Sequence, residues 1–183
     1  DLATHLHRTR LLHEGRTLTE VTAKIARDLG VRHAVLPMSD QAVRTRVRGP
    51  DGWLDFQEYF VREKTQVDVV EVDYAGAHSA LPAPGVAEAI AAAHAIIVCP
   101  SNPITSIGPI LAVPGLAHAL EATDAVVLAV TPIVGRQAVS GPAGRLMAAC
   151  GLEVSAVGVA SAYARWLDFL VVDDEDAAEA KRV

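Results

Sequence analysis

Residues 95–116 read AIIVCPSNPITSIGPILAVPGL, an apolar run that leads into a turn rich in proline, hydroxyl, amide and glycine residues. The run from Ala95 to Cys99 is typical of a short buried strand. Prolines then exclude ordinary strand pairing and restrict the backbone of the turn; they are Pro100, Pro103, Pro109 and Pro114. We expect a helix from about Pro109, whose first backbone N–H groups lack partners and favour an anion.

The side chains of this turn predict a phosphate or pyrophosphate site. The residues expected to hold it are Ser101, Asn102, Thr105 and Ser106, with Gly108 opening the helix. The alternative is a Pro/Ser-rich loop whose hydroxyls only cap the helix. Neither the Walker pattern nor the dinucleotide-binding pattern is present in the sequence, so the spacing leaves both interpretations open.

Helical and strand patterns alternate along the chain, which predicts a single α/β domain over residues 1–183 with a mostly parallel sheet covered on both faces. Thr19 is the expected N-cap of the first predicted helix and Gly30 its stop, and a polar hairpin is expected at 49–52. The predicted strands are 32–37, 67–72, 95–99, 125–131, 154–159 and 169–173. The predicted helices are 19–29, 56–62, 83–94, 109–120 with a break at Pro114-Gly115, 142–150 and 162–166.

Polar loops follow three of the predicted strands, at 37–40, 100–102 and 131–136. Ligands of such sheets bind beyond the carboxyl ends of the strands, so we expect the three loops to open at one edge. Ser39 and Asp40 could bind a nucleobase edge or a sugar, or they could cap a helix. Gly135 and Arg136 could reach a phosphate.

Composition favours a compact domain without a nucleic-acid-binding surface. Apolar residues make up 51% of the 183 residues and aromatic residues only 4%, so the core is built from Ala, Val, Leu and Ile. A net charge of −6 argues against nucleic acid as a partner, because binding it requires clustered Lys and Arg. No apolar run is long enough to cross a membrane, and two cysteines without a disulfide pattern indicate a reducing cytoplasm.

Charged residues gather at both ends of the chain. His5 and Arg8 are three positions apart and share one face of an expected helix, which is either an exposed basic face or a contact to an acceptor or anion. Residues 173–179, DDEDAAE, indicate a solvated helix start rather than a metal site. The histidines show no metal-ligand spacing.

The segment CPSNPITSIGPILAVPGL at 99–116 resembles the signature of the 2-phospho-L-lactate transferase family of coenzyme F-420 biosynthesis. Further blocks resemble the family in the same order, so the resemblance covers nearly the whole chain: DLATHLHRTRLL at 1–12, TEVTAKIARDLGV at 19–31, LPMSD at 36–40, FQEYFV at 56–61 and PIVGRQAVSGPAGRLM at 132–147. Arg136, Ser140, Gly144 and His94 depart from the family pattern, so roles for them are discounted.

The resemblance implies a Rossmann-like three-layer sandwich that lacks its first strand-turn-helix. It implies a transferase of the phosphotransferase class that moves a phospholactyl or phosphoenolpyruvyl group from a guanosine-diphospho donor to a deazaflavin, 8-hydroxy-5-deazariboflavin (Fo), and releases GMP. Ser101, Asn102, Thr105, Ser106, Gly108, Ser39, Asp40 and Gly135 would then bind the donor, and His5 and Arg8 the acceptor.

The resemblance further implies a central fragment of a longer protein. Mg²⁺ would bridge the phosphates, with its carboxylate ligands upstream, so the fragment alone would be inactive. A homodimer is compatible with the family. The alternative function is a nucleotide-sugar-binding regulator of the gluconeogenesis-factor type; SNP at 101–103 with Gly108-Pro109, and the block at 56–61, favour the transferase.

Overall fold

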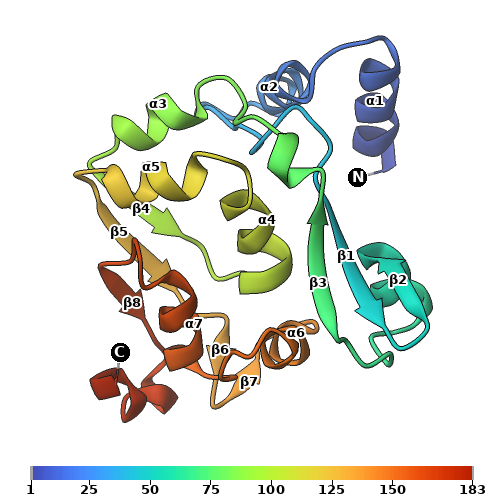
Figure 1. Ribbon diagram of the computed structural model, residues 1–183. Coiled ribbons are helices and arrows are strands. Elements are labelled where there is room, and N and C mark those ends of the chain that lie inside the picture. The colour runs from blue at the N-terminus through green and yellow to red at the C-terminus, as the bar shows by residue number, and fades with distance from the viewer. Residues whose placement is uncertain (1, 183) are drawn as a thin grey trace.

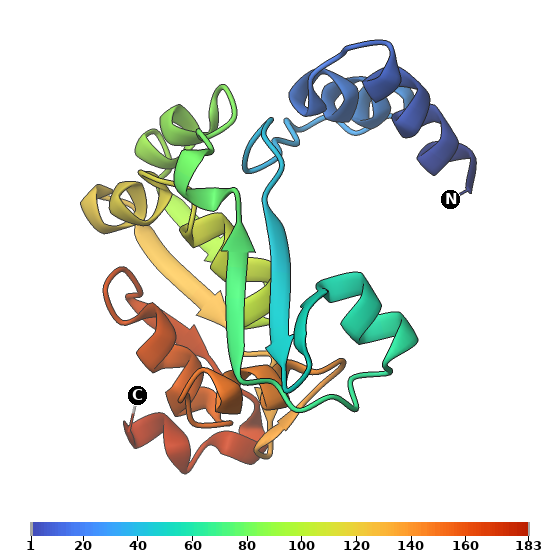
Figure 2. The same ribbon diagram turned by 45° about the vertical axis from the view of Figure 1, so that its right-hand side comes forward.

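The computed structural model describes residues 2–182, and it begins with a two-helix arm (Figures 1 and 2). The arm consists of α1 (Leu2–His13) and α2 (Leu18–Asp28), which contact each other and bury Leu11 and Val21. Figure 2 shows the arm projecting away from the remaining elements. The amino-terminal block therefore lies apart from most of the chain.

Helix α2 forms as predicted, but its predicted N-cap, Thr19, is wrong. Thr17 caps the helix: its hydroxyl accepts from the N–H of Glu20 at 3.2 Å, and the Glu20 carboxylate accepts from the N–H of Thr17 at 2.9 Å. This reciprocal capping box satisfies two N–H groups, whereas a lone hydroxyl satisfies one. Gly30 follows the helix with a φ of +73°, which confirms the predicted stop.

An antiparallel sheet, which we call sheet A, joins the arm to the rest of the molecule. It contains β1 (Arg44–Gly49), β2 (Gly52–Asp55) and β3 (Glu71–Ala75) in the order β2-β1-β3. The predicted hairpin is confirmed, because Gly49 pairs with Gly52. The predicted strand at 67–72 is displaced toward β3, and residues 32–37 form no strand in the described chain.

A parallel sheet, sheet B, carries the predicted α/β architecture. It contains β4 (Ala95–Val98), β5 (Val126–Val130) and β8 (Phe169–Val171) in the order β4-β5-β8, and both pairings are parallel. The helices that follow or precede these strands are α3 (Val86–Ala91), α4 (Gly108–Leu111), α5 (Leu116–Ala122), α6 (Ala143–Ala149) and α7 (Ala156–Tyr163). The α/β, Rossmann-like prediction is confirmed; that residues 1–183 form one domain stays a prediction.

Val127 and Ala129 of β5 point into the main core, where they join Tyr163 and Trp166 from the α7 region. The rings of Tyr163 and Trp166 stack with their centroids 4.7 Å apart. These large rings compensate for the scarcity of aromatic residues, because they bury much apolar area at the centre of the core.

The predicted strand at 154–159 is wrong, because α7 occupies this region. The Ser155 hydroxyl accepts from the N–H of Gly158 at 3.1 Å and caps the helix. Ala156, Gly158 and Val159 are all buried, so the apolar run lies against the core on several sides. Periodicity alone does not separate such a buried helix from a buried strand. The helix predicted at 162–166 is not a separate element, because residues 162–163 end α7 and residues 164–166 form a turn.

The remaining elements are short. They are η1 (Glu58–Arg62), η2 (Ala77–Ser79), η3 (Pro103–Ile107), β6 (Ile133–Val134), β7 (Gln137–Ala138), η4 (Asp174–Asp176) and η5 (Glu179–Arg182). Within residues 2–182, no single helix has the length and apolar character to cross a membrane. Together, the helical segments Pro103–Leu111 and Leu116–Ala122 have such a length and apolar composition, but they are bent by 84° relative to each other.

Candidate functional site

A cavity of about 440 Å³ opens beyond the carboxyl ends of β4 and β5. Two of the three predicted polar loops line it, those at 100–102 and 131–132, together with η3 and the segment at 139–143. Its lining residues are Phe56, Phe60, Pro100, Ser101, Asn102, Thr105, Ser106, Val130, Thr131, Pro132, Val139, Ser140, Gly141, Pro142 and Ala143. The cavity is at the position where open parallel sheets bind ligands.

Asn102 organises the loop after β4. Its side-chain oxygen accepts from the N–H groups of Ile104 at 2.9 Å and Thr105 at 3.3 Å. Its backbone oxygen accepts from the N–H groups of Ser106 at 3.0 Å and Ile107 at 3.1 Å. The first N–H groups of this helical segment are therefore satisfied within the loop, so the expectation that they are open to an anion is wrong.

The hydroxyl groups of this loop remain available instead. Ser101, Thr105 and Ser106 are half-buried and line the cavity, and no hydrogen bond within residues 2–182 engages their hydroxyls. Hydroxyls can donate to phosphate oxygens, and such charge-assisted bonds are stronger than neutral ones. The structure therefore favours side-chain donors over backbone donors at this position.

Gly108 is the first residue of α4, as predicted, but η3 leads directly into this helix, and the N–H of Gly108 donates to the backbone oxygen of Pro103. Tyr74 of β3 leaves room only for glycine at this position, because a Cβ atom at position 108 would overlap the Tyr74 hydroxyl. That hydroxyl donates to the backbone oxygen of Ile104. Burial raises the pKa of Tyr74 to about 12, which keeps the donor protonated. Tyr74 thus holds η3 against sheet A through a contact that the sequence did not indicate.

Ser39 and Asp40 lie outside this cavity, so the expectation that all three loops open at one edge is wrong. Ser39 is 2% exposed, and its hydroxyl exchanges hydrogen bonds with Gln41 at 3.1 Å. The Asp40 carboxylate accepts from the N–H and the hydroxyl of Thr19, at 2.7 and 2.9 Å. Asp40 therefore supports the amino-terminal turn of α2, in line with the capping alternative, and ligand binding by Ser39 and Asp40 stays a prediction.

Gly135 and Arg136 form the turn between β6 and β7, with φ values of +56° and +63°. The N–H of Gly135 donates to both carboxylate oxygens of Asp176 at 3.1 Å, and the carboxylate of Glu175 lies against Gly135. Arg136 pairs with Glu153 and Glu179 at 3.2 Å. Carboxylates are therefore already bound to Gly135 and Arg136, the residues that were predicted to reach a phosphate. This turn is not part of the cavity lining.

His5 and Arg8 lie on α1 in the projecting arm, and both are exposed. Neither lines the cavity, and Figures 1 and 2 place α1 on the far side of sheet A from η3. Their predicted contact with the acceptor stays a prediction that this arrangement does not support.

Three groups of cavity residues did not receive a role from the sequence. Phe56 lies just before η1 and Phe60 lies within it, in a segment that was predicted only as a short helix and as a block of family resemblance. Thr131 is buried and caps the following turn, since its hydroxyl accepts from the N–H of Ile133 at 3.1 Å. Ser140 lines the cavity although its departure from the family pattern had led to its being discounted. The signal that could have found it is Gly141-Pro142, a turn directly before α6.

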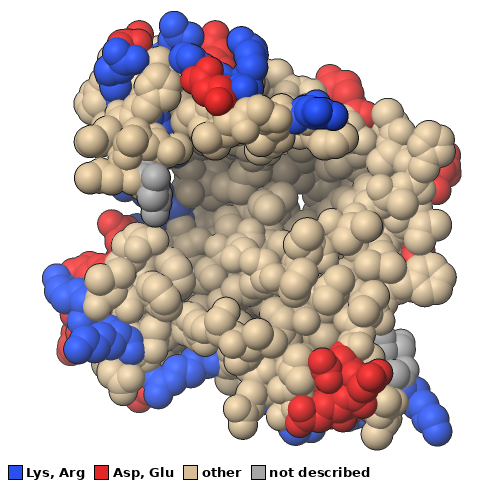
Figure 3. Space-filling view, turned by 180° about the vertical axis from the view of Figure 1, so that it is seen from behind, with Lys and Arg blue, Asp and Glu red and all other residues tan. Residues whose placement is uncertain are grey.

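The described lining of the cavity includes no Asp, Glu, Lys or Arg. Within residues 2–182, no group of three or more His, Cys, Asp or Glu side chains is arranged to hold a metal ion. Figure 3 shows the molecule from behind: charged side chains gather around the edges of this face, and its middle is uncharged and hollowed. Neutral hydroxyl and amide donors are therefore the polar groups that the cavity offers.

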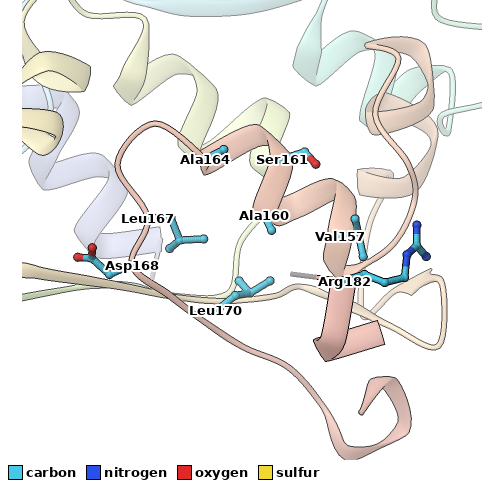
Figure 4. A pocket seen from close by; sticks show the side chains of 8 residues that line it. All are labelled: Val157, Ala160, Ser161, Ala164, Leu167, Asp168, Leu170 and Arg182. Atoms are coloured by element: carbon cyan, nitrogen blue, oxygen red, sulfur yellow. The ribbon is translucent and has the colours of Figure 1, made fainter. Parts of the chain in front are cut away.

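A smaller cavity of about 270 Å³ lies between α7 and β8 (Figure 4). Figure 4 shows Ala160, Ala164 and Leu170 beside it, with Arg182 at one end. The carboxylate of Asp168 already accepts from the N–H of Val127 at 2.8 Å. Because the Asp168 carboxylate is already bound in sheet B, this cavity has fewer polar groups available to a ligand than the cavity at η3.

The chain is similar to known proteins over nearly its whole length. The family described as 2-phospho-L-lactate transferase CofD matches residues 1–182. The 2-phospho-L-lactate transferase of Methanosarcina mazei is 42% identical over 179 residues, 98% of this chain and 58% of that protein. The phosphoenolpyruvate transferase of Kitasatospora aureofaciens is 44% identical over 181 residues, 96% of this chain and 56% of that protein.

A solved structure shares the fold. The crystal structure of a upf0052 family member from Bacillus halodurans aligns with a TM-score of 0.66 at 19% identity, covering 96% of this chain and 56% of that one. The chain thus spans a little over half the length of the proteins that it matches. Since the family match extends over nearly every residue, the chain belongs to the 2-phospho-L-lactate transferase family.

Proposed function

We propose that this chain contributes the donor-phosphate site of a transferase that moves a phospholactyl or phosphoenolpyruvyl group from a guanosine-diphospho donor to a deazaflavin. The observation that carries the proposal is the cavity beyond β4 and β5, into which the hydroxyl-bearing loop at 101–106 opens. Relatives named 2-phospho-L-lactate transferase and phosphoenolpyruvate transferase support the two donor classes.

In the proposed reaction, the terminal hydroxyl of the deazaflavin side chain attacks the phosphorus that carries the lactyl or enolpyruvyl group. A new P–O bond forms to the acceptor, the bond to the bridging oxygen breaks, and GMP leaves with that oxygen. This chemistry depends mainly on positioning and on stabilising negative charge. The hydroxyls of Ser101, Thr105 and Ser106 would donate to the phosphate oxygens, and Asn102 would hold the loop in shape.

Magnesium is expected to neutralise the diphosphate in such an enzyme, but the described residues do not fit a magnesium site. Mg²⁺ is usually bound through carboxylates, and no carboxylate lines the cavity formed by the described residues. We propose that its ligands lie outside residues 2–182 and that the chain by itself does not turn over.

Product analysis tests the proposed function. The full-length protein that carries this chain is incubated with the deazaflavin and each guanylated donor in turn, and the products are identified by mass spectrometry. The expected result is GMP and a deazaflavin whose mass has increased by the phospholactyl or phosphoenolpyruvyl group. Absence of both products with both donors would overturn the proposal.

A further inference from the structure

Two of the three phenylalanines in this chain line the cavity at η3. The rings of Phe56 and Phe60 stack, with centroids 5.7 Å apart and an angle of 15° between their planes. Phe60 is 44% exposed. A large ring left open at a cavity that also holds hydrogen-bond donors is a typical feature of a binding site.

The segment that carries the two rings is held firmly. Tyr59, between them in η1, is fully buried, and its ring lies 6.2 Å from that of Phe56. The N–H of Thr65 donates to the backbone oxygen of Tyr59 at 3.0 Å, and Arg62 pairs with Glu58 and Glu63. The η1 segment is a π-helical turn, a feature that is frequent at functional sites. The phenylalanine rings are therefore presented by a stable turn.

We propose that Phe56 and Phe60 form a stacking surface for the flat fused ring of the acceptor, with the acceptor's hydroxyl chain running toward Ser101–Ser106. This inference rests on the proposed function. A planar heterocycle would cover the exposed face of Phe60, where offset stacking and apolar burial both stabilise it. The hydroxyl loop lines the same cavity, so the ring and the phosphates would share one space.

The lining of the cavity favours the acceptor ring over the guanine of the donor. Guanine presents N–H donors at N1 and N2, which a specific site satisfies with acceptors such as a carboxylate. The described lining has no carboxylate, and Val139, Pro142 and Ala143 are apolar. A larger, more apolar ring therefore fits these surroundings better. The acceptor contact would lie at the η1 turn instead of at His5 and Arg8.

The test measures binding of the deazaflavin by its fluorescence in the full-length protein, without any donor, so that it does not depend on transfer. Phe60→Leu is expected to weaken deazaflavin binding about tenfold, and Phe60→Trp to retain it, because stacking is lost in the first and kept in the second. The affinity for GDP is expected to stay unchanged in both variants. Phe169→Leu is the matched control, since Phe169 is 61% exposed but lies on β8 outside the cavity.

Each other outcome has a defined meaning. Equal deazaflavin affinity in Phe60→Leu and the unmodified protein would overturn the stacking surface, and so would an unmodified protein that binds no deazaflavin. Loss of GDP affinity alone in Phe60→Leu would assign the rings to guanine and overturn the inference. Phe60-dependent binding without product formation would support the stacking surface and overturn the proposed transfer. Product formation together with deazaflavin binding that does not depend on Phe60 would support the proposed transfer and overturn the stacking surface.

Discussion

The loop after β4 and the loop between β6 and β7 were both predicted to reach a phosphate, yet only the first leaves donors available to a ligand. In the first, Asn102 satisfies the backbone N–H groups, and the hydroxyls of Ser101, Thr105 and Ser106 line the cavity. In the second, the N–H of Gly135 is already bound by Asp176. The difference teaches that a polar loop binds a ligand only where the rest of the protein has not already bound its donors.

Gly108→Val should have the largest effect, because it breaks the packing that shapes the first loop. A side chain at position 108 overlaps Tyr74, and overpacking of this kind costs about 3 kcal/mol at the upper end of its usual range. Urea unfolding measures the loss. Gly144→Ala is the control, since a Cβ there meets only a Val154 methyl at 3.1 Å. Equal stability of Gly108→Val and the unmodified protein would show that Tyr74 does not hold the loop.

Asn102→Asp sharpens the comparison by changing charge without removing the cap. Asp caps a helix as well as Asn does, so the stability should be nearly unchanged. A carboxylate beside a diphosphate repels it, and we expect about hundredfold weaker binding of GDP from an unfavourable energy of about 2.7 kcal/mol. Calorimetry of the full-length protein measures this, with Asn102→Ser as the uncharged capping control. Unchanged GDP affinity would show that this loop does not bind the diphosphate.

Ser106→Ala removes one side-chain donor from the first loop. Loss of a charge-assisted hydrogen bond should weaken GDP binding by about 2 kcal/mol, roughly thirtyfold, and leave the melting temperature unchanged. The matched substitution is Ser140→Ala, in the 139–143 segment of the cavity lining, where a smaller effect is expected. If the two variants bind GDP equally well, the hydroxyls at 101–106 have no special role.

Asp176→Ala breaks the second loop. Asp176 is 5% exposed, and its removal leaves the N–H of Gly135 without its acceptor, at a cost of about 1.5 kcal/mol in the free energy of unfolding. GDP affinity should not change, because this turn does not line the cavity. Asp174→Ala, an exposed neighbour, should be neutral by the same unfolding measurement. A drop in GDP affinity for Asp176→Ala would place the second loop in the site after all.

The smallest effect at neutral pH is that of Tyr74→Phe, which is recognised by a pH dependence that Tyr74 introduces. The folded protein keeps the Tyr74 proton up to a pKa of about 12, whereas an unfolded chain releases it near 10. The folded state therefore binds more protons between these pH values, and stability falls as the pH rises from about 10 toward 12. Tyr74→Phe should make this fall shallower, and cost about 1 kcal/mol at neutral pH through the lost hydrogen bond to Ile104. Identical alkaline unfolding curves for Tyr74→Phe and the unmodified protein would contradict a raised pKa of Tyr74 in the folded state.

Local signals in the sequence predicted most of sheet B and the hairpin turn of sheet A. The apolar runs at β4, β5 and β8, the helix break at Pro114-Gly115 and the turn at 49–52 all appear where expected. These features depend on residues close together in the chain, because proline and glycine restrict the backbone wherever they occur. The strand predicted at 154–159 is wrong, because a short apolar run is compatible with a buried helix as well as a strand.

The sequence by itself determined the fold class, the family and the loop at 101–106 as a candidate site. Only the tertiary structure decided which donors of the predicted loops are free. Asp176 reaches Gly135 across 41 positions, and Tyr74 reaches Ile104 across 30. Hydrogen bonds between such distant segments depend on how the sheets and helices pack, and a pattern of nearby residues does not specify that packing. The same packing brings Phe60 to the cavity that Ser101 and Ser106 line.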